Sequence, residues 1–171
     1  MKFVSEEVID KITEELDGST TIYEEAVAEL REEQPAILAY LFNEELKVLT
    51  LKEKEYLLYL ILVIWKSIEA VVEESIAKVS PDVFTQREEE NWSIIDGQKK
   101  KHFRDKLDVF FDGYPQEDLL AFVEDALVEE EEEEEEDIVT NEGREALFVI
   151  LKTILDCWTQ YKGDNKTPEN S

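Results

Sequence analysis

The sequence predicts an all-α fold: a single-domain helical bundle or short α-solenoid of about six to eight helices. Helix caps and helix stops recur along the chain, and no segment alternates apolar and polar residues as a strand does. Only five glycines and four prolines occur in 171 residues, which disfavours the many tight turns of an all-β fold. A hydrophobic content of 43% is sufficient for one compact core.

Three short helices are predicted within the first 42 residues. Ser5 is a typical cap for the first, and Gly18 is a typical stop for it. Thr20 or Thr21 is the expected cap of a second helix that runs to about residue 33. Pro35 is typical of the first turn of a third helix, where its missing N–H has no intrahelical partner to lose.

A long fourth helix is predicted to form the centre of the domain. Thr50 and Glu53 have the spacing of a capping box, which places the start of this helix. We expect the helix to extend as far as Lys78. From Leu57 to Trp65 it is apolar nearly all round, and such a helix must be buried on most sides.

The second half of the chain repeats these start and stop signals. Ser80 and Pro81 form a cap and first-turn pair, and Asp96–Gly97 ends that helix. The next helix, rich in phenylalanine, ends at Gly113, and Pro115 is expected to start another. Asn141 is the expected cap of the last helix.

Two pairs of segments resemble each other. Residues Gln34–Leu41 align with Gln116–Val123 at an offset of 82, and Val48–Leu58 aligns with Ile138–Phe148 at an offset of 90. The eight extra residues fall just before Ile138. The alternative explanation is that apolar helices resemble one another by composition alone.

The resemblance predicts two repeated three-helix units within a single helical domain, residues 1–162. The units span residues 20–78 and 99–162, and an acidic insert, residues 129–137, accounts for the difference in offset. Residues 163–171 are predicted to form a flexible polar tail.

The chain is strongly acidic, with a formal net charge of −26. The insert supplies nine of these charges, so the rest of the chain still carries −26 + 9 = −17. Binding to free nucleic acid or to anionic membranes is disfavoured, because both depend on lysine and arginine. A basic protein is the expected partner, since opposite charge steers association. Solubility is the simpler explanation of the acidity.

Two groups of residues are candidates for partner binding. The first combines Trp92, an aromatic residue in a polar stretch, with the acidic run Glu129, Glu130, Glu131, Glu132, Glu133, Glu134, Glu135, Glu136 and Asp137. The second is a basic patch of Lys99, Lys100, Lys101 and Arg104. Because positive charge opposes the dipole at a helix start, either the helix begins earlier, or the patch faces the insert, or it binds an external anion.

Sequence motifs for catalysis are lacking. The single His102 excludes the usual multi-histidine zinc sites, and no phosphate-binding or nucleophile-elbow glycine loop occurs. Cys157 follows Asp156, and a neighbouring acid makes a thiol a poorer nucleophile. We therefore expect no catalytic residue, no metal ligand and no cofactor. The competing interpretation is a divalent-metal-dependent enzyme using surface carboxylates, with Glu32 and Glu33 as candidates.

The sequence predicts a cytoplasmic location. One cysteine allows no internal disulfide, the first residues resemble no secretory signal, and the longest strongly apolar run is too short to span a bilayer. The predicted function is a non-enzymatic, acidic helical interaction module that binds or neutralises a basic partner.

Overall fold

The computed structural model describes residues 1–43, 46–128 and 139–161. Within these ranges the chain forms eight helices and no strand, which confirms the predicted all-α class. The helices are α1 (Glu6–Gly18), α2 (Thr20–Glu33), α3 (Pro35–Leu41), α4 (Leu51–Val71), α5 (Pro81–Asp96), α6 (Phe103–Phe111), α7 (Glu117–Val128) and α8 (Asn141–Trp158). None of these helices has the length and apolarity needed to cross a membrane.

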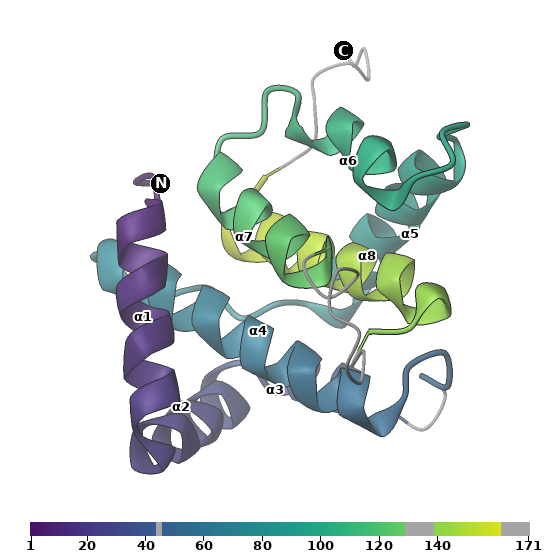
Figure 1. Cartoon of the computed structure of the whole chain (residues 1–171). Helices are drawn as coiled ribbons and strands as arrows, with labels where there is room; N and C mark the ends of the chain where they lie inside the picture. Colours follow the sequence, from purple (N-terminus) through teal and green to yellow (C-terminus); the bar gives the residue numbers. More distant parts are fainter. Residues whose placement is uncertain (44–45, 129–138, 162–171) are drawn as a thin grey trace.

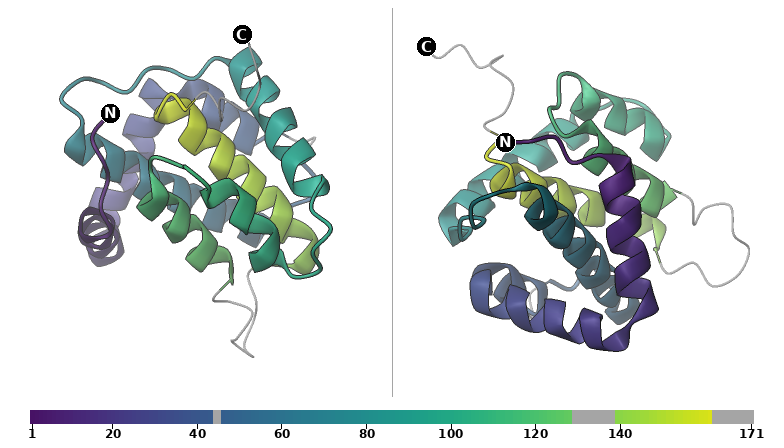
Figure 2. Two further views of the ribbon diagram at one scale, coloured as in Figure 1. Left: turned by 90° about the horizontal axis from the view of Figure 1, so that it is seen from above. Right: turned by 90° about the vertical axis from the view of Figure 1, so that its left-hand side faces the viewer.

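Helices α4 and α8 pack against each other at the centre of the molecule (Figure 1). Helices α1 and α2 pack on α4, whereas α5 and α7 pack on α8 and lie on either side of it (Figure 2). The run Leu60–Trp65 of α4 is buried, as is Ala146–Leu151 of α8. The Trp65 and Trp158 rings meet with their centroids 5.1 Å apart. The prediction of a buried fourth helix is therefore confirmed.

Three predicted helix starts are shifted by one or two residues. Ser19, not Thr20 or Thr21, caps α2, because its extended backbone (φ −152°) lets its side chain accept a hydrogen bond from Ile22 N. Thr140, not Asn141, caps α8 by accepting from Gly143 N at 2.9 Å. Helix α7 begins at Glu117 rather than at Pro115.

Helix α4 ends at Val71, seven residues before the predicted limit. The cause is a tertiary contact with Gln34, the buried residue that separates α2 from α3. Gln34 Oε1 accepts a hydrogen bond from Val79 N at 3.0 Å, and its Nε2 donates to Ala77 O at 2.9 Å. These bonds satisfy the backbone of a non-helical segment, so residues 77–79 have no need of helical partners.

Gln116 makes the same pair of bonds in the second half of the chain. Its Oε1 accepts from Val4 N and its Nε2 donates to Lys2 O, each at 2.9 Å. Gln34 therefore holds the segment before α5, and Gln116 holds the segment before α1. The sequence comparison had aligned these two glutamines. Lys2, Val4 and Val79 lie outside the predicted three-helix units, whereas Ala77 lies within the unit of residues 20–78. The repeat itself stays a prediction.

Glu53 caps two helices at once. Its Oε1 accepts from Thr50 N at 2.8 Å, which completes the predicted capping box of α4. Its Oε2 accepts from both Thr140 N and Thr140 Oγ1 at 3.0 Å, at the start of α8. Gly143 makes room for this carboxylate, because a Cβ at that position would lie 2.0 Å from Glu53 Oε2. The starts of the two central helices thus share one buried acid.

Helical spacing places ten aromatic residues on apolar stripes and so predicts that they pack in the core, and they do so with one exception. Trp65, Phe110, Phe148 and Trp158 are buried, whereas Tyr40, Tyr56, Tyr59, Phe111 and Phe122 are half-buried against the core. Phe42 is 60% exposed, so its assignment to the core was wrong. It follows Leu41, the last residue of the short helix α3, and the chain turns away from the core there.

Candidate functional site: an acidic groove between α1, α4 and α7

The residues predicted to bind a partner are only partly described by the structure. The acidic run Glu129–Asp137 lies outside the described residues. Trp92 lies on α5 and is half-buried against the core, so only part of its ring surface faces solvent. The structure therefore neither tests the acidic run nor joins Trp92 to it.

The basic patch forms a loop and the first turn of α6. This helix begins at Phe103, so Lys99, Lys100 and Lys101 precede it, and the suggestion of an earlier start is wrong. Lys100 lies 3.7 Å from Asp108, and Arg104 lies 3.9 Å from Asp125. All four side chains of these two pairs are more than half exposed, so each pair contributes little to stability.

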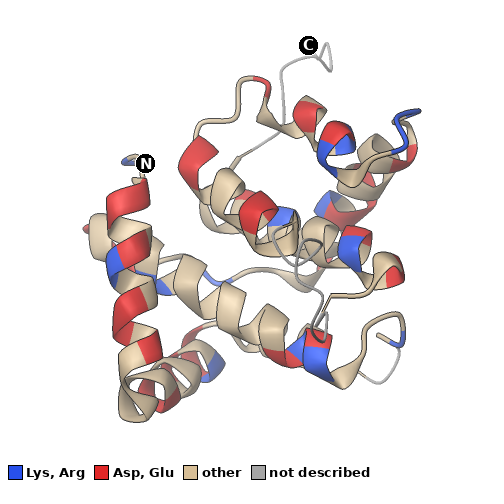
Figure 3. Cartoon of the chain, in the orientation of Figure 1, with Lys and Arg blue, Asp and Glu red and all other residues tan. Residues whose placement is uncertain are grey.

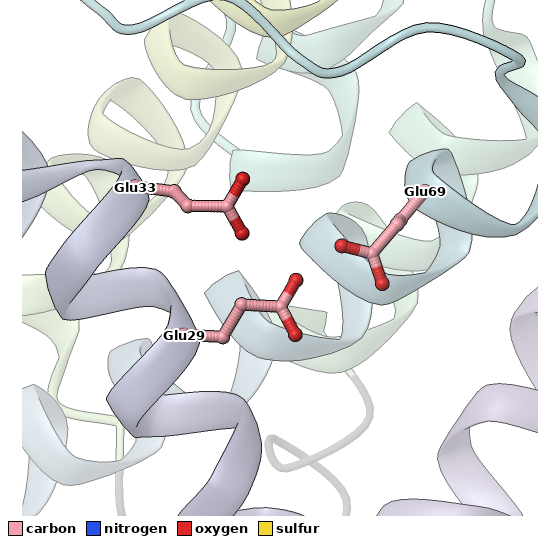
Figure 4. A group of neighbouring side chains, drawn as sticks. All are labelled: Glu29, Glu33 and Glu69. Carbon is pink, nitrogen blue, oxygen red and sulfur yellow. The ribbon is translucent and has the colours of Figure 1, made fainter.

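Glu33, one of the candidate carboxylates, belongs to a cluster with Glu29 of the same helix and Glu69 of α4. Figure 4 shows the three side chains converging, and one oxygen of each lies within 4.8 Å of the others. Lys66 Nζ already contacts Glu29 at 3.2 Å and Glu69 at 2.6 Å. Glu32 is exposed and is not part of the cluster.

Burial and neighbouring charges in this cluster shift the pKa values of all three glutamates. Burial and the neighbouring Glu29 raise the pKa of Glu33. Burial and contact with Glu29 raise the pKa of Glu69. The pKa of Glu29 is lowered by hydrogen bonds with Glu69, Lys66 and the Trp65 indole. Lys66 thus neutralises part of the charge that a metal ion would otherwise neutralise.

A more open site lies between α1, α4 and α7. It is a groove of about 440 Å³, which falls within the size range of small-molecule pockets. Two walls carry acids, Glu6 and Asp10 from α1 and Asp118 and Asp125 from α7, and Figure 3 shows acidic residues on both helices. The floor is apolar and aromatic, with Tyr56, Tyr59, Leu60 and Phe122. We call this site the acidic groove.

Hydrogen bonds fix the aromatic floor of the acidic groove. The Tyr56 hydroxyl donates to Ala126 O of α7 at 2.8 Å, and the Tyr59 hydroxyl donates to Asp17 Oδ1 of α1 at the same distance. The two rings lie nearly parallel, with an interplanar angle of 15°. Burial and the adjacent Asp17 raise the pKa of Tyr59, so its hydroxyl stays protonated near neutral pH. The floor is therefore held in place from both walls.

The walls of the acidic groove carry negative charge that the described residues hardly compensate. No lysine or arginine is among the residues that line it. Asp118 Oδ2 accepts from Glu6 N, at the start of α1, at 2.9 Å, so α1 and α7 are joined beside the groove. The nearest ion pair is the exposed contact between Asp125 and Arg104. The site thus offers carboxylates beside ring surfaces, a combination that attracts cations.

A second groove among the described residues is not acidic. It lies between α3 and α5, measures about 220 Å³, and is lined by Ala36, Ala39, Tyr40, Pro81, Phe84 and Thr85, among other uncharged residues. At the sequence offset of 82, Ala36 and Tyr40 correspond to Asp118 and Phe122. The two grooves therefore differ in the charge of their linings.

A buried ion pair lies away from both grooves. Lys152 Nζ contacts the two oxygens of Asp156 at 2.8 and 2.9 Å, and both residues are almost fully buried. The Tyr114 hydroxyl and Asn91 Nδ2 also donate to Asp156. Burial lowers the pKa of Lys152, although Asp156 opposes that shift. This network joins α5, α8 and the segment before α7.

Two other residues, His102 and Cys157, carry reactive side chains. His102 is exposed and immediately precedes α6. Cys157 is half-buried, and burial together with Asp156 raises the pKa of its thiol to about 11. A thiol with that pKa is almost entirely protonated near neutral pH and is therefore a poor nucleophile.

Sequence analysis missed the acidic groove because its walls come from helices more than 100 residues apart. One signal was present: Glu6 and Asp10 are four positions apart and so share one face of the first helix. Comparison with known proteins adds nothing to this site, since no family model, curated protein or solved structure matches the chain.

Proposed function

We propose that this protein is a non-enzymatic, acidic helical interaction module, and that it binds a basic protein partner at the acidic groove. The observation that carries the proposal is the lining of the groove. Four carboxylates face a fixed aromatic floor, and no basic side chain of the described residues lines the site. Such a surface favours a positively charged partner over a neutral or anionic one.

The charge of the whole chain supports the same partner class. A net charge of −26 accelerates the approach of a basic protein and slows the approach of an acidic one. Long-range attraction alone gives no preferred binding position. The acidic groove supplies one, because it concentrates charge next to apolar surface that a bound side chain would cover.

The proposal is tested by neutralising the groove without changing its shape. Fluorescence anisotropy would follow a labelled peptide rich in lysine and arginine, at about 50 mM and about 500 mM salt. We expect Asp10→Asn/Asp125→Asn to weaken binding at low salt by about threefold to tenfold, as expected for two exposed charges.

The matched control is Asp82→Asn/Glu89→Gln, which removes two exposed charges from α5, outside the groove. It should change the affinity by less than about twofold, because only the general charge of the surface is reduced. Equal effects of the two double variants would show that binding has no preferred site, and the proposal would then fail.

A second candidate function, a divalent-metal-dependent enzyme, is favoured by the convergence of Glu29, Glu33 and Glu69. Carboxylate oxygens suit Mg²⁺ and Mn²⁺. The contacts of Lys66 with two of the three acids oppose it. Calorimetric titration with Mn²⁺ decides the matter: stoichiometric binding that is lost in Glu33→Ala would favour the enzyme, and no measurable heat would exclude it.

A further inference from the structure

The core of this protein shows how the chain itself holds a cation. The ammonium group of Lys152 combines a carboxylate partner, Asp156, with the faces of three aromatic rings. Its Nζ lies 4.6 Å from the centroid of the Tyr114 ring and 5.0 Å from that of Tyr161. Carboxylates and ring faces therefore act together on one positive charge.

The acidic groove presents the same two kinds of group on the surface. Tyr56, Tyr59 and Phe122 line it beside the carboxylates of Asp10 and Asp118. Among the described residues, no lysine or arginine pairs with the side chain of Asp10, and Asp118 accepts only from the backbone N–H of Glu6. The groups that hold a cation in the core are thus in place here, and the cation has to come from another molecule.

We propose that the acidic groove recognises arginine side chains of the basic partner in preference to lysine. This inference rests on the proposed function, because it names the chemical group that the same groove binds. The two walls and the floor are the structural reason. A guanidinium group is planar and has five N–H donors, so it can lie against a ring while it donates to carboxylates on both walls.

Lysine fits this groove less well. Its ammonium group is a strongly hydrated point charge. The contacts in an open groove compensate only part of the hydration free energy that this group loses on binding. The volume of about 440 Å³ is that of a small-molecule pocket, so the groove accommodates side chains rather than a whole helix of a partner.

The test compares three labelled peptides by fluorescence anisotropy with the full chain, at about 50 mM salt. They contain three Gly-Ser-Arg units, three Gly-Ser-Lys units, or three Gly-Ser-citrulline units, the last being close in shape to arginine but neutral. We expect the arginine peptide to bind about threefold to tenfold more tightly than the lysine peptide, since cation–π contacts favour arginine. The citrulline peptide should not bind measurably.

Two variants connect this preference to the groove. Phe122→Leu keeps an apolar side chain but removes a ring, so it should reduce the arginine-to-lysine affinity ratio toward one. Asp10→Asn/Asp125→Asn should weaken both cationic peptides, and Asp82→Asn/Glu89→Gln should leave the ratio unchanged. The circular dichroism of each variant checks that the helices are intact.

The outcomes separate this inference from the proposed function. Equal affinity for the arginine and lysine peptides, both weakened by Asp10→Asn/Asp125→Asn, overturns the arginine preference and leaves the proposed function standing. An arginine preference that Phe122→Leu does not change overturns the role of the ring. If neither cationic peptide binds the wild-type chain, both proposals fail.

Discussion

Replacing Glu53 should destabilise the protein more than replacing any exposed glutamate, because its carboxylate caps two helices. The side chain is 0% exposed and accepts three hydrogen bonds, one from Thr50 N and two from Thr140. No lysine or arginine of the described residues contacts it. The positive ends of the α4 and α8 dipoles therefore provide the favourable electrostatic environment for this buried acid.

The expected size of the effect follows from the groups that lose a partner. Glu53→Ala leaves the N–H groups of Thr50 and Thr140 unpaired, at about 1–3 kcal/mol each, and creates a small cavity. Relief of the desolvation of a buried carboxylate offsets part of this loss. We expect a net decrease of about 3–4 kcal/mol in the free energy of unfolding. For a chain of this length, that lowers the melting temperature by about 6–16 °C.

Glu53→Gln should have a smaller effect than Glu53→Ala. The glutamine side chain keeps the volume and one acceptor oxygen, so it can cap one of the two helices but not both. Its amide group points donors at the other helix start, where only donors are found. A decrease of about 2 kcal/mol in the free energy of unfolding is expected.

Thermal and urea unfolding, followed by circular dichroism at 222 nm, measure both variants. The control is Glu55→Gln, an exposed residue on the same helix, which should change stability by less than about 0.5 kcal/mol. If Glu53→Ala unfolds within about 1 kcal/mol of wild type, the two-helix cap is not a major source of stability, and the reasoning above is wrong.

Three further perturbations test the same physical account by thermal unfolding. Gly143→Ala should destabilise wild type by about 1–3 kcal/mol, because the new Cβ overlaps the Glu53 carboxylate, but should be neutral or stabilising in a Glu53→Ala background; a similar loss in both backgrounds would contradict the overlap. Lys152→Met should cost about 3–5 kcal/mol, because it leaves Asp156 buried without its cation, and a loss below about 1 kcal/mol would show that Tyr114 and Asn91 suffice. Lowering the pH from 7 to about 5 should raise the melting temperature, because burial raises the pKa of four glutamates in the folded state, which therefore binds protons more readily than the unfolded chain: Glu33, Glu69, Glu88 and Glu124. A fall in the melting temperature would contradict this sign.

The sign of the pH effect follows from the direction of the pKa shifts. A raised pKa in the folded state stabilises the fold below the ordinary value of 4.5, and this stability is lost as the pH rises through the folded pKa. Glu29 acts in the opposite direction, since its pKa is lowered. Four glutamates have a raised pKa and one has a lowered pKa, so acidification from neutral pH should favour folding.

The helices were predictable because their signals are local. The capping box of Thr50 and Glu53, the proline at residue 35 and the stop at Gly113 all act within one turn of the chain. Gly113 has φ +72°, a conformation that few other residues adopt. The apolar run around Leu60–Trp65 likewise required burial whatever its partners were.

The end of α4 was not predictable in this way. Residues 72–78 carry no proline or glycine, so local signals allowed the helix to continue. Gln34 instead holds this segment in a non-helical conformation, because it forms hydrogen bonds with Ala77 and Val79, which are more than 40 positions away. The exposure of Phe42 was missed for a related reason, because helical spacing does not show where a short helix turns away from the core.

The sequence by itself determined the all-α class, most helix starts and the buried central helix, because caps, breakers and apolar periodicity are short-range properties. It also determined the strong negative charge. Only the tertiary structure decided where part of that charge gathers beside aromatic rings, because residues of α1, α4 and α7 line the acidic groove together. The shared cap of Glu53 depends on packing in the same way, since Thr140, which caps the second helix, lies 87 positions later. Contacts between distant residues arise only when helices pack, and local sequence patterns therefore do not predict them.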